Sequence, residues 1–209
     1  MPVGSPAVSA RVVVLVSGGG SNLEALIDAA RVEGYGARIV AVGADRDCGG
    51  LELAAAAGIP TFVTRVGDAA DRAEWDRSLT ARVAAFNPDL VISAGFLKLV
   101  GAEFLAEFGG RFLNTHNTLL PAFPGIHGPR DALEYGVKLT GATLFIVDAG
   151  IDTGVIVAQV AVPVADDDTV ETLTERIKVA ERAQLVDHLG RLCRDGWRIE
   201  GRRVVLGAG

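Results

Sequence analysis

The sequence of 209 residues contains only two cysteines and three histidines. Cys48 and Cys193 are far apart and match no metal-ligand spacing, so the sequence predicts neither a disulfide framework nor a zinc site. We expect two ordinary reduced thiols and no bound metal. The G-x-S-x-G and H-E-x-x-H motifs are also absent, which argues against a covalent acyl-enzyme and against metal-dependent catalysis.

The chain also lacks long apolar runs and an excess of basic residues. No apolar run reaches the ~18 residues of a membrane-spanning helix, and the start, MPVGSPAVSA, lacks the features of a signal peptide. Twenty Lys and Arg residues against 26 Asp and Glu give a net charge of −6, whereas nucleic-acid-binding proteins usually carry a basic face. We therefore expect a cytoplasmic protein with no nucleic-acid partner and no membrane association.

Apolar runs alternate with helical patterns through the first half of the chain. The run RVVVLVS at 11–17 is typical of a strand buried on both faces of a parallel sheet. Further strands are predicted at 38–42, 61–64 and 89–95, with helical patterns between them. This alternation predicts an α/β fold, namely a Rossmann-like, doubly wound, mostly parallel sheet flanked by helices.

The regular alternation of predicted strands and helices ends in the second half of the chain. Strands and helices follow each other less regularly, and the sequence ends in a long helix and a short hairpin. The predicted elements are strands at 111–116, 140–148 and 155–164, a short helix at 129–136, a helix from about Thr169 to Arg194, and a hairpin at 197–206 that turns at Gly201.

Three glycines follow the first predicted strand and precede a helix. The free N–H groups and positive dipole end of a helix N-terminus suit a phosphate, and Ser21 and Asn22 can add side-chain donors. We also expect Ser21 and Glu24 to form a capping box. Leu23 stands where the dinucleotide-binding fingerprint needs its third glycine, and no Walker lysine follows. The loop is therefore either a single-phosphate site or a plain tight turn.

Two of the three histidines lie in the stretch RFLNTHNTLLPAFPGIHG. Asn114 and His116 are two residues apart at the end of a predicted strand, so both side chains lie on one face, at the edge where open α/β sheets bind ligands. A histidine can shuttle a proton, and an Asn amide can donate to a developing oxyanion. A structural histidine held in a loop is the alternative interpretation.

The glycine-rich loop VDAGIDTGVI carries a third candidate. Asp152 can point into the same cleft and orient His116, although Asp is also common in turns for structural reasons. His127 is a candidate ligand contact, and His188 is expected to be an incidental residue of the long helix. These groups suit direct acyl transfer between two bound substrates.

Four segments resemble the formyltetrahydrofolate-dependent formyltransferase family, namely SGGGSNL, DLVISAGFLKLV, RFLNTHNTLLPAFPGIHG and DAGIDTGVIVAQ. The resemblance runs in order from about Val12 to the end of the long helix. The SGGGSNL segment marks the members that use glycinamide ribonucleotide. The resemblance implies the formyltransferase fold, 10-formyltetrahydrofolate as co-substrate, no metal, and formyl transfer to the amine of glycinamide ribonucleotide in purine (IMP) biosynthesis.

The resemblance also implies roles for individual residues. Asn114, His116 and Asp152 match the catalytic trio, in which Asn114 and protonated His116 stabilise the tetrahedral oxyanion and Asp152 tunes the histidine. Residues expected to contact the ribonucleotide are Gly20, Ser21, Asn22, Lys178 and Glu181. Residues expected to contact the folate are Arg72, Leu97, Lys98, Leu99, Val100, Asn114, Val147, Asp148 and Asp152, with Arg72 and Lys98 towards its pterin or glutamate end.

One domain over residues 10–209 is expected to hold the whole site. Its N-terminal half would bind the phosphate, and its C-terminal half would bind the folate and carry out catalysis. A flexible extension of residues 1–9 would precede the domain. The sequence is compatible with a homodimer. The sequence departs from the family after His116, where the family usually has Pro-Ser and this chain has Asn117-Thr118. Because a proline would fix φ, the rigidity of this loop is an open question.

Two classes of alternative function stay open. A formyltetrahydrofolate hydrolase, or a formyltransferase for methionyl-tRNA or a sugar nucleotide, would share the scaffold. The hydrolase and the tRNA enzyme usually carry an extra domain for which this chain has no room. A nucleotide-binding sensor or a dinucleotide oxidoreductase can use the same glycine loop, and Leu23 argues against the oxidoreductase.

Overall fold

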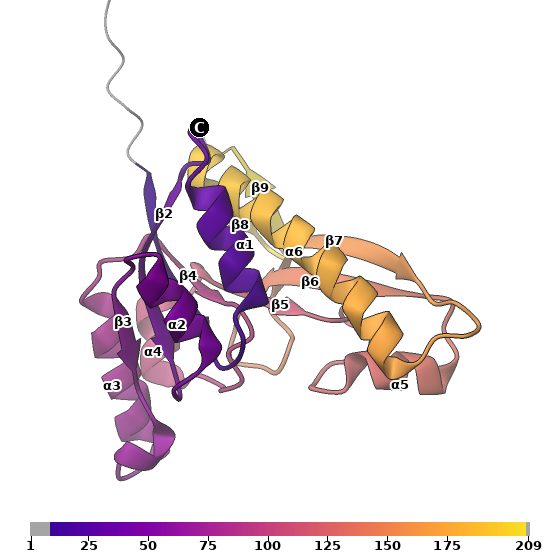
Figure 1. The fold of residues 1–209 in the computed structure, drawn as a ribbon, viewed down its shortest axis with the longest axis horizontal. Coiled ribbons are helices and arrows are strands. Elements are labelled where there is room, and N and C mark those ends of the chain that lie inside the picture. The colour runs from indigo at the N-terminus through magenta and orange to yellow at the C-terminus, as the bar shows by residue number, and fades with distance from the viewer. Residues whose placement is uncertain (1–8, 208–209) are drawn as a thin grey trace, which may run out of the picture.

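A seven-stranded sheet forms the centre of the protein, with helices on both faces (Figure 1). The computed structural model describes residues 9–207. The strand order is β3-β2-β1-β4-β5-β6-β7, in which β1 to β5 pair in parallel and β6 and β7 are antiparallel. The predicted mostly parallel, doubly wound sheet is therefore confirmed. The strands are β1 (Ala10–Val16), β2 (Ala37–Ala44), β3 (Thr61–Val63), β4 (Leu90–Ser93), β5 (Phe112–His116), β6 (Leu139–Ile146) and β7 (Val155–Pro163).

The helices and a terminal hairpin complete the fold. They are α1 (Ser21–Ala30), α2 (Gly49–Ala56), the 3₁₀ helix η1 (Val66–Asp68), α3 (Arg72–Ala84), α4 (Ala102–Phe108), α5 (Gly128–Tyr135), α6 (Val170–Asp195), and the hairpin of β8 (Trp197–Glu200) and β9 (Arg203–Leu206). The predicted hairpin and long helix are confirmed. Sequence patterns did not predict α4, because its seven residues are too few to display a helical repeat. Apart from Ser9, the predicted N-terminal extension lies outside the described residues.

Strand β1 shows how the sheet is buried on both faces. Val12, Val14 and Val16 pack into a core cluster with α1 and α6, whereas Val13 and Leu15 pack into a second cluster with α3 and α4. All five side chains are fully buried. Burial of each is worth about 1.5–3 kcal/mol, which explains why this run has no polar alternation.

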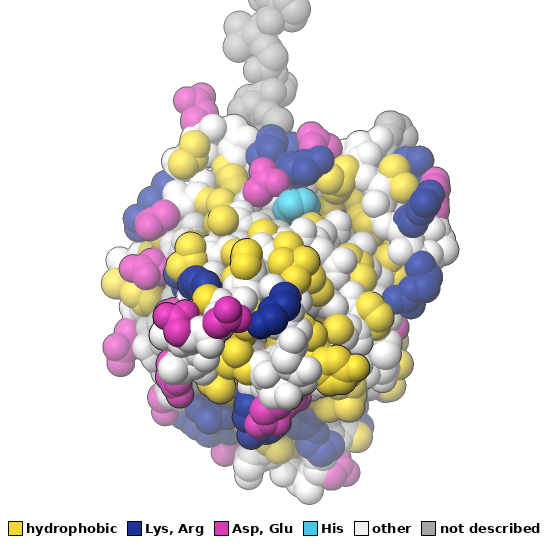
Figure 2. Space-filling model, turned by 90° about the vertical axis from the view of Figure 1, so that its right-hand side faces the viewer, with side chains coloured by type: hydrophobic (Ala, Val, Ile, Leu, Met, Phe, Trp, Pro, Cys, Tyr) yellow, Lys and Arg dark blue, Asp and Glu magenta, His cyan; other side chains and the backbone are white. Residues whose placement is uncertain are grey.

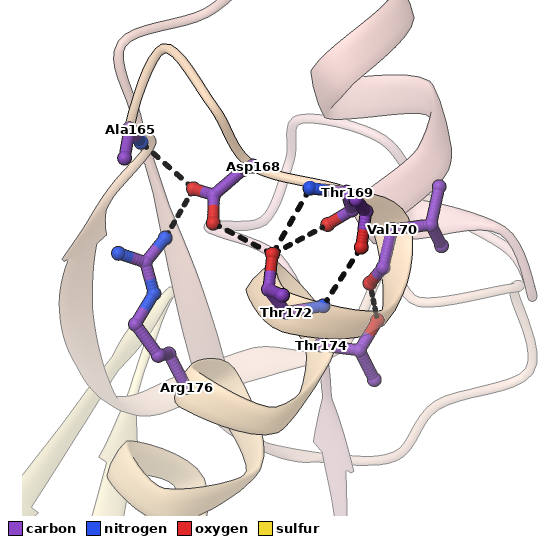
Figure 3. A network of polar contacts seen from close by, with 7 residues as sticks. All are labelled: Ala165, Asp168, Thr169, Val170, Thr172, Thr174 and Arg176. Carbon is purple, nitrogen blue, oxygen red and sulfur yellow. Dashed lines mark hydrogen bonds and ion pairs between the residues drawn. The ribbon is translucent and has the colours of Figure 1, made fainter.

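The long helix α6 begins in a network of side-chain caps, shown in Figure 3. Thr169 Oγ1 accepts a hydrogen bond from Thr172 N at 3.2 Å, and Thr172 Oγ1 accepts one from Thr169 N at 2.9 Å. Asp168 accepts a bond from Ala165 N and pairs with Arg176. Desolvation raises the pKa of Asp168, but these bonds outweigh it, so the net pKa is lowered. The contacts of the Asp168 carboxylate therefore add to the free energy of unfolding at neutral pH. This contribution is lost as the pH falls through the lowered pKa of Asp168.

The capping box predicted for the first helix is wrong. Helix α1 begins at Ser21 itself, and its N-cap is Gly20, which has a left-handed φ of 84° and offers no side-chain cap. Ser21 is therefore the first helical residue, one position too late to cap the helix. The N–H groups of the first turn consequently lack a cap from the N-cap residue, as expected of a helix end that binds an anion.

The surface carries charges of both signs. On the end of the molecule that Figure 2 shows, Lys and Arg side chains are interspersed with Asp and Glu among scattered hydrophobic side chains. This face therefore offers no broad basic surface of the kind that binds a nucleic-acid backbone. Within residues 9–207, no helix combines the length and apolarity needed to cross a membrane.

Candidate active site

Strand β5 presents alternate side chains to the two faces of the sheet. Phe112 belongs to the core cluster that contains α3 and α4, whereas Leu113 belongs to the cluster that contains α1 and α6. By strand alternation, Asn114 and His116 lie on the α3–α4 side and Thr115 lies on the α1–α6 side. The predicted pair therefore shares one face at the carboxyl end of β5, and the residue between them faces the other.

His116 is buried between two oxygen acceptors. Its side chain is 7% exposed, and its Nδ1 lies 3.6 Å from Asp152 Oδ2. Its Nε2 lies 2.9 Å from the carbonyl oxygen of Phe123, and Asp152 Oδ2 also accepts a hydrogen bond from Gly125 N at 2.8 Å. A ring that carries both protons can donate towards both oxygens, whereas a neutral ring can donate to one. The structure thus brings His116 and Asp152 together in an arrangement suited to an imidazolium ion.

The two residues that supply these oxygens have an uncommon backbone conformation. Phe123 has a φ of 52° and Asp152 a φ of 54°, both in the left-handed region. Asp tolerates this region, but a bulky residue such as Phe rarely adopts it. Such conformations cost about 1–3 kcal/mol each and are concentrated at functional sites. Their coincidence on both sides of His116 supports a functional role for this histidine.

Hydrogen bonds hold the loop after His116, where the family usually has Pro-Ser. The fully buried Thr118 donates its hydroxyl to Ala122 O at 2.6 Å. Its carbonyl oxygen accepts a bond from Thr143 Oγ1 at 2.7 Å. The departure from the family pattern therefore does not leave this loop without support.

The glycine turn before α1 is exposed on one side and packs tightly against α2 on the other. Gly18, Gly19 and Ser21 are exposed. A Cβ on Gly20 would lie 2.8 Å from Gly50 Cα, and the φ of Gly20 is also left-handed, so only glycine fits there. Gly50 N donates to Gly18 O at 3.0 Å. Close backbone packing thus fixes the turn while its outer side stays open.

Asn22 and Glu181 connect the glycine turn to β5. Asn22 Nδ2 donates to Glu181 Oε1 at 2.7 Å, and Thr115 Oγ1 donates to the same oxygen at 3.0 Å. Glu181 is buried although it lies on the surface helix α6. Because Thr115 lies between Asn114 and His116, this network joins the predicted phosphate turn to the predicted catalytic strand.

Lys178 does not join this network. Its Nζ donates to Glu175 Oε1 at 2.7 Å, and about half of its side chain is exposed. Within residues 9–207, no hydrogen bond or ion pair links it to Asn22 or Glu181. The structure therefore brings one of the two predicted α6 residues to the glycine turn and leaves the other at the surface.

The segment 97–100, which follows β4, carries two exposed leucines. Leu97 and Leu99 are 70% and 64% exposed, which leaves two large apolar side chains available to a ligand. Leu97 N donates to Ser17 Oγ at 2.9 Å, and Arg72 donates to Leu99 O. The backbone of the segment is thus held while its leucine side chains stay free, and Arg72 is engaged in holding it.

Helix α3 also supplies the carboxylate at the end of this segment. Asp76 is buried and accepts hydrogen bonds from Gly101 N, Glu103 N and Phe104 N at 2.6, 3.0 and 3.2 Å. It therefore caps the N-terminus of α4 from a neighbouring helix.

Lys98 contacts a buried carboxylate. Its Nζ lies 3.6 Å from Asp45 Oδ2, and Asp45 also pairs with Arg46 at 2.7 Å, with 1% of the Asp45 side chain exposed. Desolvation raises the pKa of this carboxyl, but Arg46, the Ser17 hydroxyl and the charge of Lys98 outweigh it, so the net pKa is lowered. The ammonium group of Lys98 is thus paired with a carboxylate of the protein itself.

The loop between β6 and β7 is shaped by two of the predicted folate contacts. Asp148 Oδ1 accepts hydrogen bonds from Gly150 N at 3.0 Å and from Thr153 Oγ1 at 2.6 Å. Val147 packs against the core cluster that contains α3 and α4. Both residues therefore help to fix the loop that carries Asp152.

Within residues 9–207, neither of the other two histidines forms a hydrogen bond or an ion pair with His116. His127 is exposed at the N-cap of α5, and His188 Nδ1 lies 3.0 Å from Gln184 O within α6. Thr115, Asp45 and Asp76 were not identified from the sequence, because no local pattern points to partners so far along the chain.

The described residues around the site show no metal cluster. Within the described residues, no group of three or more His, Cys, Asp and Glu side chains is arranged to hold a metal ion. A depression of about 480 Å³ lies elsewhere, between α1 and α6, and none of the site residues lines it. It is lined by Ala25, Tyr35, Arg182, Ala183, Val186, Asp187 and Arg194.

Known proteins resemble this chain over most of its length. The family model described as "Formyl transferase" matches residues 10–189. A phosphoribosylglycinamide formyltransferase of Mycobacterium tuberculosis (strain ATCC 25618 / H37Rv) is 55% identical over 202 residues, which cover 97% of this chain and 94% of that protein. The trifunctional purine biosynthetic protein adenosine-3 of Homo sapiens is 42% identical over 173 residues, which cover 82% of this chain and 17% of that protein. The crystal structure of glycinamide ribonucleotide transformylase 1 from Symbiobacterium toebii matches with a TM-score of 0.91 and 41% identity, covering 95% of this chain and 94% of that one.

Proposed function

The chain belongs to the formyl transferase family, and from this premise we propose that it has phosphoribosylglycinamide formyltransferase activity. It transfers the formyl group of 10-formyltetrahydrofolate to the amine of N1-(5-phospho-D-ribosyl)glycinamide, giving the N2-formyl product and tetrahydrofolate in IMP biosynthesis. The observation that carries this proposal is the 55% identity to a relative of that name, because the match spans 97% of the chain.

The first chemical step is attack of the substrate amine on the formyl carbon. A C–N bond forms, and the carbonyl oxygen becomes an oxyanion on a tetrahedral carbon. Asn114 donates to this oxyanion from the same face of β5 as His116. The Nε2–H of the doubly protonated His116 ring exchanges its contact with Phe123 O for one with the oxyanion, while Nδ1–H stays directed at Asp152. A side-chain amide in this role is worth roughly 10²–10³-fold in rate.

The second step is expulsion of the folate nitrogen. The oxyanion re-forms the carbonyl, and the bond between the formyl carbon and N10 of tetrahydrofolate breaks. The proton lost by the amine reaches N10 through His116 or through water. The carboxylate of Asp152, 3.6 Å from Nδ1, stabilises the imidazolium ion throughout.

The glycine turn binds the phosphate of the ribonucleotide. Gly20, Ser21 and Asn22 provide donors at the uncapped N-terminus of α1. Glu181 accepts a hydrogen bond from a hydroxyl or amine of the same ligand. Lys178 reaches the ligand by leaving Glu175, which costs little because exposed ion pairs contribute at most about 1 kcal/mol.

The folate lies against segment 97–100 and the loop that carries Asp152. Leu97 and Leu99 cover its apolar ring system, with Val100, Val147 and Asp148 shaping the surrounding pocket. Arg72 and Lys98 act by holding this segment, since their charged groups already contact Leu99 O and Asp45.

Two features of the structure argue against a dinucleotide oxidoreductase. Leu23 is fully buried where the dinucleotide fingerprint requires its third glycine. Asp45 follows β2, the place from which dinucleotide-binding folds contact the ribose, but its carboxylate is buried and paired with Arg46 and Lys98. The chain therefore lacks the third glycine of the fingerprint and a free carboxylate after β2 for the ribose of such a cofactor.

The test is an assay with purified protein, 10-formyltetrahydrofolate and glycinamide ribonucleotide. We expect tetrahydrofolate and the formylated ribonucleotide to appear together in equal amounts. Release of formate when no ribonucleotide is added would instead indicate a hydrolase. Failure to form either tetrahydrofolate or the formylated ribonucleotide would refute the proposal.

A further inference from the structure

Three structural elements meet at one oxygen of Glu181. Asn22 from α1 and Thr115 from β5 both donate to Oε1, at 2.7 and 3.0 Å, and Glu181 itself comes from α6. Its second oxygen, Oε2, accepts no hydrogen bond from the part of the chain that the structure describes. The protein therefore holds one oxygen of this buried carboxylate and leaves the other for a ligand.

Thr115 is well suited to fix a carboxylate. Branching at Cβ restricts its χ1 rotation, so its hydroxyl is held in place at little cost in conformational entropy. It lies on the α1–α6 side of β5, opposite the face that presents Asn114 and His116. One strand thus supplies the two reactive side chains on one face and the support for Glu181 on the other.

We propose that Thr115 is a positioning residue of the ribonucleotide site, whose hydroxyl fixes Glu181 so that Oε2 faces the bound ribonucleotide. This inference rests on the proposed function. Thr115 does not contact the reacting atoms and acts through Glu181.

The contribution of Thr115 increases when the ligand binds. The proposed phosphate site recruits the side-chain amide of Asn22, which in the free protein donates to Glu181. Thr115 is then the remaining donor to Oε1. Without it, the carboxylate can turn away from the ligand, and ribonucleotide affinity falls while the formyl-transfer chemistry stays intact.

The test is the kinetic comparison of Thr115→Val with the wild-type protein. We expect the KM for glycinamide ribonucleotide to rise about tenfold, because a hydrogen bond to a charged group is lost, while kcat and the KM for 10-formyltetrahydrofolate change little. Thr115→Ser keeps the hydroxyl and should restore most of the affinity. Thr140→Val is the matched control, since Thr140 is equally a strand threonine but its buried hydroxyl has no partner within residues 9–207.

A double-mutant cycle guards against a purely structural effect. In a Glu181→Gln background, Thr115→Val should raise the KM for the ribonucleotide much less than it does in the wild type. Equal effects in both backgrounds, an unchanged KM in Thr115→Val, or no recovery in Thr115→Ser would overturn the inference. If the wild-type protein does not formylate the ribonucleotide, the proposed function itself is refuted. That result differs from the three outcomes above, which are measured on variants of an active enzyme.

Discussion

The imidazole of His116 has an oxygen on each side, and the proposed chemistry depends on this residue. The carbonyl oxygen of Phe123 lies 2.9 Å from one ring nitrogen, and Asp152 Oδ2 lies 3.6 Å from the other. A ring with one proton can donate to only one of these oxygens, whereas a doubly protonated ring can donate towards both. In the proposed mechanism, the Nε2–H of the imidazolium ion leaves the Phe123 carbonyl and donates to the oxyanion.

His116→Ala should reduce kcat by roughly 10²–10⁴-fold, the usual contribution of a positioned proton-transfer group. The dissociation constant for the ribonucleotide should change little, because Asn22 and Glu181 remain in place. Stopped-flow kinetics and calorimetric titration measure the two quantities. His188→Ala is the matched control and should behave like the wild type, and near-normal turnover in His116→Ala would remove this residue from the mechanism.

Asp152→Asn should lower kcat and alter its pH profile. The substitution keeps the shape of the side chain and removes its negative charge, which disfavours the imidazolium ion. The limb of the profile that reports loss of the imidazolium proton should therefore move to lower pH. Rates of formyl transfer measured from pH 5 to 9 provide the check, with an unaltered profile as the contrary outcome.

At the scale of elements, segment 97–100 is held in place by the secondary structures around it. Ser17, after β1, binds its first backbone N–H, and Arg72 from α3 binds the carbonyl of Leu99. Asp76, also from α3, caps the helix that follows. Two exposed leucines on so well-anchored a backbone form a pre-organised apolar surface, which reduces the entropic cost of binding a flat ligand.

Asp76→Asn should destabilise the protein and weaken folate binding together. In the variant, the side-chain NH₂ group of Asn would face at least one of the backbone N–H groups that now donate to the carboxylate. We therefore expect a loss of about 2–4 kcal/mol in the free energy of unfolding. Thermal melting and the KM for 10-formyltetrahydrofolate measure the two effects. Asp166→Asn is the control, because Asp166 forms an exposed pair with Lys138, and it should change stability very little. Equal melting temperatures for the two variants would contradict this role of Asp76.

At the scale of the whole molecule, local patterns predicted the fold and the shared face of Asn114 and His116 on β5. The buried run of β1, the glycine turn and the Asn114–His116 spacing are short-range signals that a sequence displays directly. The hydrogen bonds that support the site join residues far apart in the sequence. Thr115 and Glu181, for example, are 66 residues apart. No pattern in the sequence around Thr115 could reveal that partner, since α6 is placed by packing of its apolar face. For the same reason the sequence did not show that Lys98 pairs with Asp45.

Ligand-dependent melting distinguishes the proposed formyltransferase from a dinucleotide oxidoreductase. A ligand at 100 times its dissociation constant stabilises the folded protein by about 2.7 kcal/mol, or roughly 5–10 °C for a domain of this size. We expect such shifts with glycinamide ribonucleotide and with a folate analogue, and none with NAD or NADP. A shift with a dinucleotide alone would favour the oxidoreductase.

The most direct test of the account is a crystal structure of the protein with glycinamide ribonucleotide and a non-transferable analogue of 10-formyltetrahydrofolate. We predict the phosphate at the backbone N–H groups of Ser21 and Asn22, and the carbon equivalent to the formyl group beside Asn114 and His116. Binding of the phosphate away from the glycine turn, or of that carbon out of reach of His116, would contradict the central claim that one site joins both substrates.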